Sequence, residues 1–111
     1  MIEITQNNNY KLITSEEKTF NSFLNKFKQI YNKIEGSHII LEFSSKNNFS
    51  EQNILLLLEY AFIQKKKGLS FVIIDNSVDI DKFPEELNIV PTLIEAEDVI
   101  EIENIQRNLG F

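Results

Sequence analysis

The side chains that could carry out catalysis are few in this sequence. His38 is the only histidine and cysteine is absent, so paired-histidine motifs and cysteine-based zinc sites are excluded. A serine nucleophile would need His38 as its base, and there is no G-x-S-x-G sequence to expose such a serine at a strained turn. His38 opens a short apolar run, where a structural edge histidine is the simpler interpretation. The sequence therefore predicts no catalytic residue and no metal site.

Three acidic side chains follow an apolar run that ends at residue 75. Asp75, Asp79 and Asp81 are expected at the carboxyl edge of a sheet, where ligands tend to bind in open α/β folds. They lack the glycine and the spacing of a calcium-binding loop, so a solvated acidic loop is the preferred interpretation. The three glycines of the chain lie far apart, which leaves no glycine-rich phosphate loop and predicts no cofactor.

A polar cluster within NNFSEQNILLLL, residues 47–58, has the signals of a helix start. Ser50 is a good N-cap, and Phe49 and Ile54 have the spacing of a hydrophobic staple. The helix is predicted to continue to about Lys67, where three lysines face its negative end and a glycine stops it.

This predicted helix is apolar on more than one side, although a helix lying on one sheet face needs only a single stripe. One face carries Ile54, Leu57, Leu58, Ala61 and Phe62. The remaining apolar residues are spread over the rest of the surface and are Leu55, Leu56, Tyr60 and Ile63. Either neighbouring elements bury this second set, or Leu55, Leu56 and Tyr60 form a surface for a partner or a second copy.

Strands and a further helix are predicted before this segment. Residues 2–6 and 10–14 alternate in polarity around three asparagines, which predicts a β-hairpin. Thr14 and Glu17 have the spacing of a capping box for a helix that Gly36 closes. The apolar stripe of that helix comprises Phe20, Phe23, Leu24, Phe27, Ile30, Tyr31 and Ile34.

Buried strands are predicted at the apolar runs 38–43 and 69–75. Residues 76–90 are expected to form a connector with a short helical turn and a brief strand. Thr92 and Glu95 form a second capping box. The apolar residues of the last helix are Leu93, Ala96, Val99, Ile100, Ile105 and Leu109. Its mostly solvent-facing acidic residues are Glu97, Asp98, Glu101 and Glu103.

This order of elements predicts one α/β domain over residues 1–111, with a mixed sheet of four to five strands, an N-terminal hairpin and three to four helices. An apolar content of 42% with nine phenylalanines can fill a single core. The first residues are polar and do not resemble a leader, and the longest apolar run, residues 54–58, is far shorter than the roughly 20 residues of a membrane span. A cytoplasmic protein without a membrane partner is therefore predicted.

Charge is uneven along the chain. Residues 75–111 carry ten acidic side chains against Lys82 and Arg107, a balance of −8, whereas residues 1–74 carry +2. Nucleic-acid binding usually needs a basic stripe, and here the lysines are scattered apart from residues 65–67. Direct binding of nucleic acid is therefore not expected.

Three segments, HIILEFSSKNNFSEQNILLLL, GLSFVIID and LNIVPTLIEAEDVI, together resemble the STAS domain of anti-sigma factor antagonists. That family has a strand of the type L-D-L-S, a loop, a D-S-S-G-L motif that starts a helix, and a last helix announced by P-T-x-x-E-A. Residues 41–44 match the strand, and Pro91, Thr92, Glu95 and Ala96 match the start of the last helix. The resemblance extends in order over nearly the whole chain. Thioredoxin, which IVPTL also resembles, is the alternative fold, but both redox cysteines are missing and a helix is predicted after Pro91.

The resemblance places the family's D-S-S-G-L motif on Ser50, Glu51, Gln52, Asn53 and Ile54. In the family, the second serine is phosphorylated by a partner kinase and restored by a phosphatase. Gln52 at this place cannot accept phosphate, so the resemblance implies that the usual switch is lost. Ser50 is either a simple cap or a site of modification, since phosphate is favoured at a helix N-terminus.

The segment EIENIQRNLGF resembles small acidic STAS-like bacterial proteins that are sometimes labelled ribonuclease Z. That enzyme is a two-zinc tRNA 3′-end nuclease with several histidines and a much longer chain. With one histidine and no cysteine, this chain would be at most a companion of such an enzyme.

These observations lead to the hypothesis of a non-enzymatic, STAS-like module that binds another protein, either a kinase-like anti-sigma factor or an RNA-processing enzyme. The predicted contact surface includes the loop 44–49 and the residues Ser50, Glu51, Gln52, Asn53, Leu55, Leu56 and Tyr60. Two alternatives stay open: a metal-dependent hydrolase or nuclease that uses His38, and a homodimer that associates through the same helix.

Overall fold

A five-stranded mixed sheet forms the centre of the fold in the computed structural model, which describes residues 2–44 and 46–110. The strands lie across the sheet in sequence order and are β1 (Ile2–Gln6), β2 (Lys11–Ser15), β3 (Ile39–Glu42), β4 (Phe71–Ile74) and β5 (Asn88–Val90). β1 is antiparallel to β2, and the other neighbouring strands are parallel. The predicted α/β fold with an N-terminal hairpin is confirmed.

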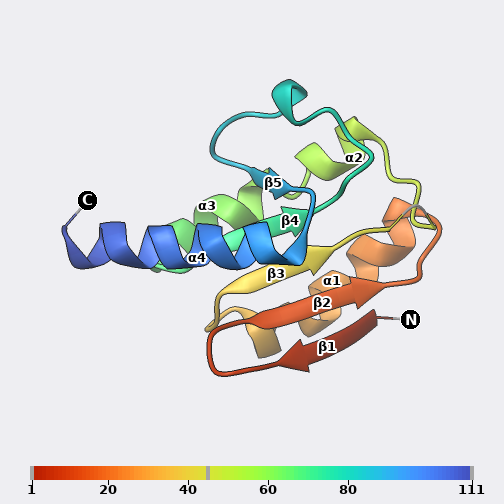
Figure 1. Cartoon of the computed structure of the whole chain (residues 1–111). Coiled ribbons are helices and arrows are strands. Elements are labelled where there is room, and N and C mark those ends of the chain that lie inside the picture. The colour runs from red at the N-terminus through yellow and green to blue at the C-terminus, as the bar shows by residue number, and fades with distance from the viewer. Residues whose placement is uncertain (1, 45, 111) are drawn as a thin grey trace.

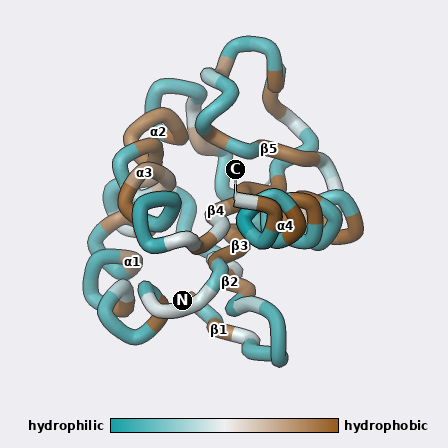
Figure 2. Tube along the Cα trace, turned by 90° about the vertical axis from the view of Figure 1, so that its left-hand side faces the viewer, coloured by the Kyte–Doolittle hydropathy of each residue, from teal (hydrophilic) through white to brown (hydrophobic). Residues whose placement is uncertain are grey.

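Helices cover both faces of this sheet. They are α1 (Phe20–Ile34), α2 (Glu51–Leu55), α3 (Leu58–Lys66) and α4 (Leu93–Asn108), and a 3-10 turn spans Ile80–Lys82. Figures 1 and 2 show α1, α2 and α3 on one face and α4 on the other. The crossovers from β2 to β3 and from β3 to β4 step across the sheet in the same direction, so crossovers of one hand place their helices on one face. In the described part of the chain, no helix is both long and apolar enough to cross a membrane.

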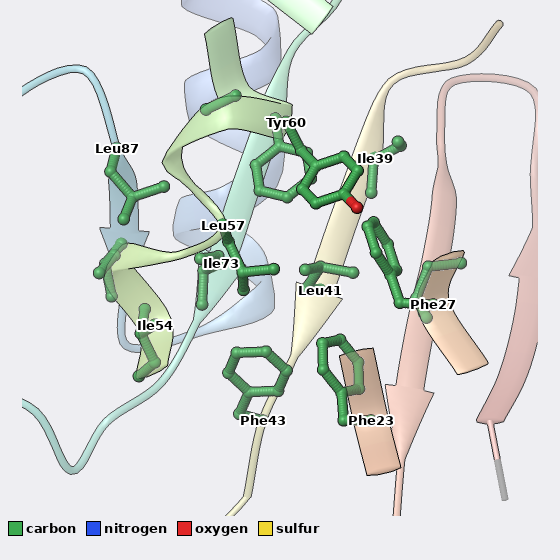
Figure 3. Packing of buried hydrophobic residues seen from close by; sticks show 14 of the residues in the cluster. Phe23, Phe27, Ile39, Leu41, Phe43, Ile54, Leu57, Tyr60, Ile73 and Leu87 are labelled. Carbon is green, nitrogen blue, oxygen red and sulfur yellow. The ribbon is translucent and has the colours of Figure 1, made fainter. Parts of the chain in front are cut away.

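Alternate residues of the strands supply a separate core on each face. Fully buried members of the larger core, under α1 to α3, are Ile13, Phe23, Phe27, Ile34, Ile39, Leu41, Ile54, Leu57 and Ile73, most of them shown in Figure 3. The core under α4 comprises Tyr10, Ile40, Val72, Ile74, Ala96 and Ile100. Since β3 and β4 are buried on both faces, their sequences are continuous apolar runs rather than alternating ones.

The helix α1 begins later than the sequence predicts. Its N-cap is Thr19, whose hydroxyl oxygen accepts a hydrogen bond from the Ser22 N–H at 3.2 Å. Thr14 lies within β2 and pairs with Glu3, because the hairpin continues to the end of that strand. The prediction of a capping box between Thr14 and Glu17 is therefore wrong.

The carboxylate of Glu17 instead anchors the turn that leads into α1. It accepts hydrogen bonds from the Lys26 ammonium group and from the Ser22 hydroxyl, the latter at 2.8 Å. These donors, Lys26 above all, lower the pKa of Glu17 to about 2. A carboxyl whose folded pKa is below its unfolded value of about 4.3 gives stability that is present above that value and lost as the pH falls through the folded pKa.

Replacement of Glu17 by glutamine is consequently expected to matter most above about pH 5 and least near about pH 2. The measurement is the urea midpoint of the wild type and of Glu17→Gln at a series of pH values. A difference between the two midpoints that does not change with pH would contradict this role of the carboxylate.

The helix α4 starts at the predicted cap, and the Thr92 hydroxyl accepts the Glu95 N–H at 3.2 Å. Of the apolar residues that mark this helix in the sequence, Ala96 and Ile100 are buried, whereas Ile105 and Leu109 are exposed. Five residues turn a helix by about 500°, so a side chain at 105 points roughly 140° away from one at 100. The apolar residues of this helix therefore do not all face the sheet.

Candidate protein-binding surface

The predicted helix start at residue 50 is present, with both halves of a capping box. The Ser50 Oγ accepts a hydrogen bond from the Asn53 N–H at 3.1 Å, and the Asn53 Oδ1 accepts one from the Ser50 N–H at 3.3 Å. Asn53 thus takes the place usually held by glutamate or glutamine. The Ser50 hydroxyl serves as the cap, and its modification stays a prediction.

One buried side chain, Asn47, fixes the loop that leads to this helix start. Its Nδ2 donates to the carbonyl oxygens of Ser15 (2.9 Å) and Glu17 (2.8 Å), and its Oδ1 accepts the Ser44 N–H at 2.9 Å. The loop is therefore tied to the turn between β2 and α1. Sequence reasoning missed Asn47, since in a polar cluster nothing distinguishes a buried asparagine from an exposed one.

Aromatic packing provides the second anchor of the same loop. The Phe49 ring lies 5.3 Å from the Phe20 ring, 5.6 Å from the Phe23 ring and 5.1 Å from the Phe43 ring, centroid to centroid. Ser45, which belongs to the predicted contact loop, lies outside the described residues. With a polar anchor at 47 and an aromatic anchor at 49, the helix start is held in one position relative to the sheet.

The segment predicted as one helix to Lys67 is broken into α2 and α3. Around the break, hydrogen bonds join residues three apart, from the Leu56 N–H to the Asn53 carbonyl (3.0 Å) and from the Leu57 N–H to the Ile54 carbonyl (2.9 Å). Leu57 is fully buried at this turn. The prediction of a single helix is wrong, because this tight turn separates α2 from α3, although the buried positions 54, 57, 60, 61 and 64 still recur every three to four residues.

Tyr60 is part of this core and not of the surface, since only 7% of it is exposed. Its ring makes edge-on contacts with Phe27 and Tyr31, each at 5.0 Å between centroids. Figure 3 shows the Tyr60 and Phe27 side chains next to one another beside β3. The prediction that Tyr60 contributes to a contact surface is therefore wrong.

Four apolar side chains do remain exposed on the side of these helices that is turned away from the sheet. They are Leu55, Leu56, Phe62 and Ile63, and we call them the α2–α3 outer surface. The two pairs are seven residues apart, two helical turns, which places them on one side. Leu56 is the most exposed of the four, at 56%. Gln52, which the resemblance aligns with the phosphoacceptor serine of the STAS family, is also exposed.

A hollow of about 560 Å³ lies at the carboxyl ends of the strands, where open α/β folds often bind ligands. Its lining includes three carboxylates, Glu3, Glu16 and Glu42, and one lysine, Lys46. No buried side-chain nitrogen or oxygen among the described residues lacks a hydrogen-bond partner. The described part of the hollow therefore contains no buried, unpaired polar group that points to a ligand.

The aspartates predicted near this edge have local structural roles. Asp75 accepts hydrogen bonds from the N–H (2.9 Å) and the hydroxyl (2.7 Å) of Ser77, and Asp79 caps the 3-10 turn by accepting the Asp81 N–H at 3.1 Å. Within residues 2–44 and 46–110, no three histidine, cysteine or acidic side chains are placed to hold a metal ion.

His38 lies at the opposite, amino-terminal edge of the sheet and joins β3 to β4. Its Nδ1 accepts a hydrogen bond from the Ser70 N–H at 2.9 Å. Burial lowers the pKa of His38, the Arg107 guanidinium lowers it further, and Glu103 opposes the shift. The Nδ1 of this imidazole is thus engaged by the backbone of the neighbouring strand.

Neither a scan against protein-family models nor a search of curated proteins finds a match to this chain. Among the described residues, the distinctive features are an anchored helix start and the exposed apolar surface that follows it. Apolar side chains gathered on a surface are typical of protein recognition. This face of the molecule is therefore the candidate for protein recognition.

Proposed function

We propose that this chain is a non-enzymatic regulatory module that binds another protein, in the manner of STAS anti-sigma factor antagonists. The contact surface consists of the helix start, residues 50–53, together with the α2–α3 outer surface. The observation that carries the proposal is the exposure of four apolar side chains directly after a helix start that Asn47 and Phe49 hold in place. Burying such side chains against a partner is favourable, and a rigid surface loses little entropy on binding.

The environment of the polar side chains supports binding rather than catalysis. The Nδ1 of His38 is occupied by a backbone N–H, and the hydroxyl of Ser50 caps a helix. Gln52 replaces the family's phosphoacceptor, so partner binding is expected to be constitutive or controlled by other means than phosphorylation at that position.

Replacement of Leu56 by aspartate is expected to abolish partner binding without unfolding the domain. Because Leu56 is 56% exposed, the free energy of unfolding should change by less than about 0.5 kcal/mol. A charge in the centre of an apolar contact, in contrast, costs the complex most of its affinity. The measurement is capture of partners from extract of the source cells by tagged wild type and by Leu56→Asp, with identification by mass spectrometry.

The matched control is Ile94→Asp, an exposed apolar position in α4 on the other face of the sheet. A kinase-like anti-sigma factor or a sigma factor that is lost with Leu56→Asp and kept with Ile94→Asp would support the proposal. An RNA-processing enzyme with the same behaviour would instead support an accessory role. A partner captured equally by all three proteins would contradict the proposed surface.

A further inference from the structure

A second apolar surface lies on α4, on the face of the helix opposite to the sheet. It consists of Ile94, Ile102, Ile105 and Leu109, which are between 52% and 72% exposed, and we call it the α4 outer stripe. At about 100° per residue, these four side chains fall within roughly 80° of one another around the helix. The buried residues Ala96 and Ile100 lie on the other side of the same helix. Thus α4 is apolar on two opposite sides, and only one of them is covered in the described part of the chain.

Acidic side chains flank the α4 outer stripe. Glu95, Asp98 and Glu101 are exposed, and their carboxylates have no hydrogen-bond or ion-pair partner among the described residues. The position of Asp98, four residues from both Ile94 and Ile102, puts one of these charges within the stripe itself. No lysine or arginine shares this side of the helix.

The polar groups on the inner side of α4 are, in contrast, paired with the sheet. The Tyr10 hydroxyl donates to Glu97 and the Ser70 hydroxyl donates to Glu103, each at 2.6 Å. The single cation of the helix, Arg107, donates to the Ser70 hydroxyl at 3.1 Å and to the Asn104 side chain at 2.7 Å. The helix is thus fixed on the sheet, and its one positive charge is turned away from the stripe.

We propose that the α4 outer stripe binds a basic amphipathic helix of another protein. An apolar stripe accepts the apolar side of a partner helix, whose anchors repeat every three to four residues. Because the carboxylates along the stripe are unpaired, a partner with lysine or arginine beside those anchors would bind with complementary charge. From residue 94 to residue 109 the stripe is about 22 Å long, enough for about four turns of a partner helix.

Charge argues against the other occupants of such a stripe. A second copy of this chain would bring Glu95, Asp98 and Glu101 against the same carboxylates, and like charges across an interface oppose association. An anionic lipid surface would be repelled for the same reason. A basic helix alone satisfies both the apolar and the charged part of the surface.

This inference goes beyond the proposed function, because it concerns the opposite face of the sheet. Figure 2 shows α4 separated by the sheet from α2 and α3. With a binding surface on each face, the domain can hold two partners at the same time and act as an adaptor between them.

The test measures binding of a synthetic peptide to the full chain. The peptide has about 18 residues and is built from leucine and lysine, with the leucines at helical spacing. Binding is measured by fluorescence anisotropy at about 50 mM and about 300 mM salt, and the contact residues are mapped by amide chemical shifts. The same peptide with glutamate in place of every lysine is the charge control. The variants are Ile102→Gln/Ile105→Gln and Asp98→Lys/Glu101→Lys, and the matched control is Leu56→Gln/Ile63→Gln on the other face.

The lysine peptide is expected to bind, more weakly at high salt, with shift changes confined to the exposed side of α4. Ile102→Gln/Ile105→Gln should raise its Kd by roughly tenfold or more, since two apolar anchors are lost. Asp98→Lys/Glu101→Lys should raise the Kd by a similar factor. The control variant Leu56→Gln/Ile63→Gln should bind the lysine peptide as tightly as the wild type does. The glutamate peptide should not bind. Lack of binding, shift changes elsewhere, or equal binding of both peptides would overturn the proposal.

Two further outcomes would assign the stripe to another occupant and so also overturn the proposal. One is a dimer in sedimentation equilibrium that Ile102→Gln/Ile105→Gln dissociates. The other is binding to phosphatidylserine vesicles that the same variant abolishes. Failure of the Leu56→Asp capture experiment would leave this result unaffected, because the two surfaces lie on different faces.

Discussion

The Tyr60→Asp variant is expected not to fold. The Tyr60 ring packs against Phe27 and Tyr31 in the larger core, and removal of a buried aromatic ring costs about 3–5 kcal/mol. The substitution also puts a carboxylate among apolar side chains, where an unpaired charge costs several kcal/mol more or forces protonation. A domain of this size is stable by about 5–15 kcal/mol, so the two losses together remove most or all of its stability. The measurement is urea unfolding followed by near-ultraviolet circular dichroism.

The Tyr60→Phe variant is the matched control for this result. It keeps the ring, and the Tyr60 hydroxyl has no hydrogen bond to another described residue, so stability should change by less than about 1 kcal/mol. If Tyr60→Asp remained folded with an unchanged urea midpoint, Tyr60 would belong to the surface. The described break between α2 and α3 would then also be wrong.

The Asn47→Ala variant is expected to lose about 2–4 kcal/mol of stability and to release the loop before α2. Three hydrogen bonds disappear, and the carbonyl oxygens of Ser15 and Glu17 and the N–H of Ser44 lose their partner. Each such bond contributes about 1 kcal/mol, and a buried group that is left unpaired adds a further penalty. The expected results are a lower urea midpoint and faster hydrogen exchange of the Ser44 amide.

The neighbouring Lys46→Ala variant controls for a general effect of mutating the loop. Lys46 is exposed and its ammonium group has no ion-pair partner among the described residues, so this change should be neutral within about 0.5 kcal/mol. Equal stability of Asn47→Ala and Lys46→Ala would mean that Asn47 does not anchor the loop. Since the anchored loop presents Ser50 and the residues after it, Asn47→Ala should also weaken partner capture.

The strands could be predicted from the sequence because burial on both faces leaves an unambiguous pattern. The runs at 38–43 and 69–75 contain β3 and β4 within one or two residues. Two of the helix starts were also predictable, since Ser50 and Thr92 each provide a hydroxyl oxygen three residues before a free N–H. At α1 the same signal misled, because Thr14 and Thr19 are both followed by suitable residues and only the pairing of β2 with β1 decides between them.

The interior of the α2–α3 segment could be predicted only in part. Ile54, Leu57 and Ala61 of the predicted buried face are buried, whereas Phe62, predicted on the same face, is exposed, and Tyr60 is buried instead. Where nearly every side of a helix is apolar, the sequence pattern does not single out the side that packs on the sheet.

Gln64 illustrates the same limit. It follows the apolar residues and precedes three lysines, yet it is fully buried, where its side chain accepts a hydrogen bond from the Tyr31 hydroxyl (2.9 Å) and donates one to the Ser37 carbonyl (2.9 Å). Its position three residues after Ala61 and seven after Leu57 is on the buried side, but a glutamine there indicates a solvent-exposed residue unless its hydrogen-bond partners, which come from distant parts of the chain, are known.

The order of the strands has a consequence for folding of the chain during its synthesis on the ribosome. Because every strand pairs with the one made just before it, the sheet can grow in the order of synthesis, with each strand finding its neighbour already in place. The helix α4, which covers Ile40, Val72 and Ile74, is made only after all five strands. Until α4 has left the exit tunnel, the apolar side chains on one face of the nascent sheet are exposed to solvent. During that interval the chain is most prone to aggregate and most in need of a chaperone.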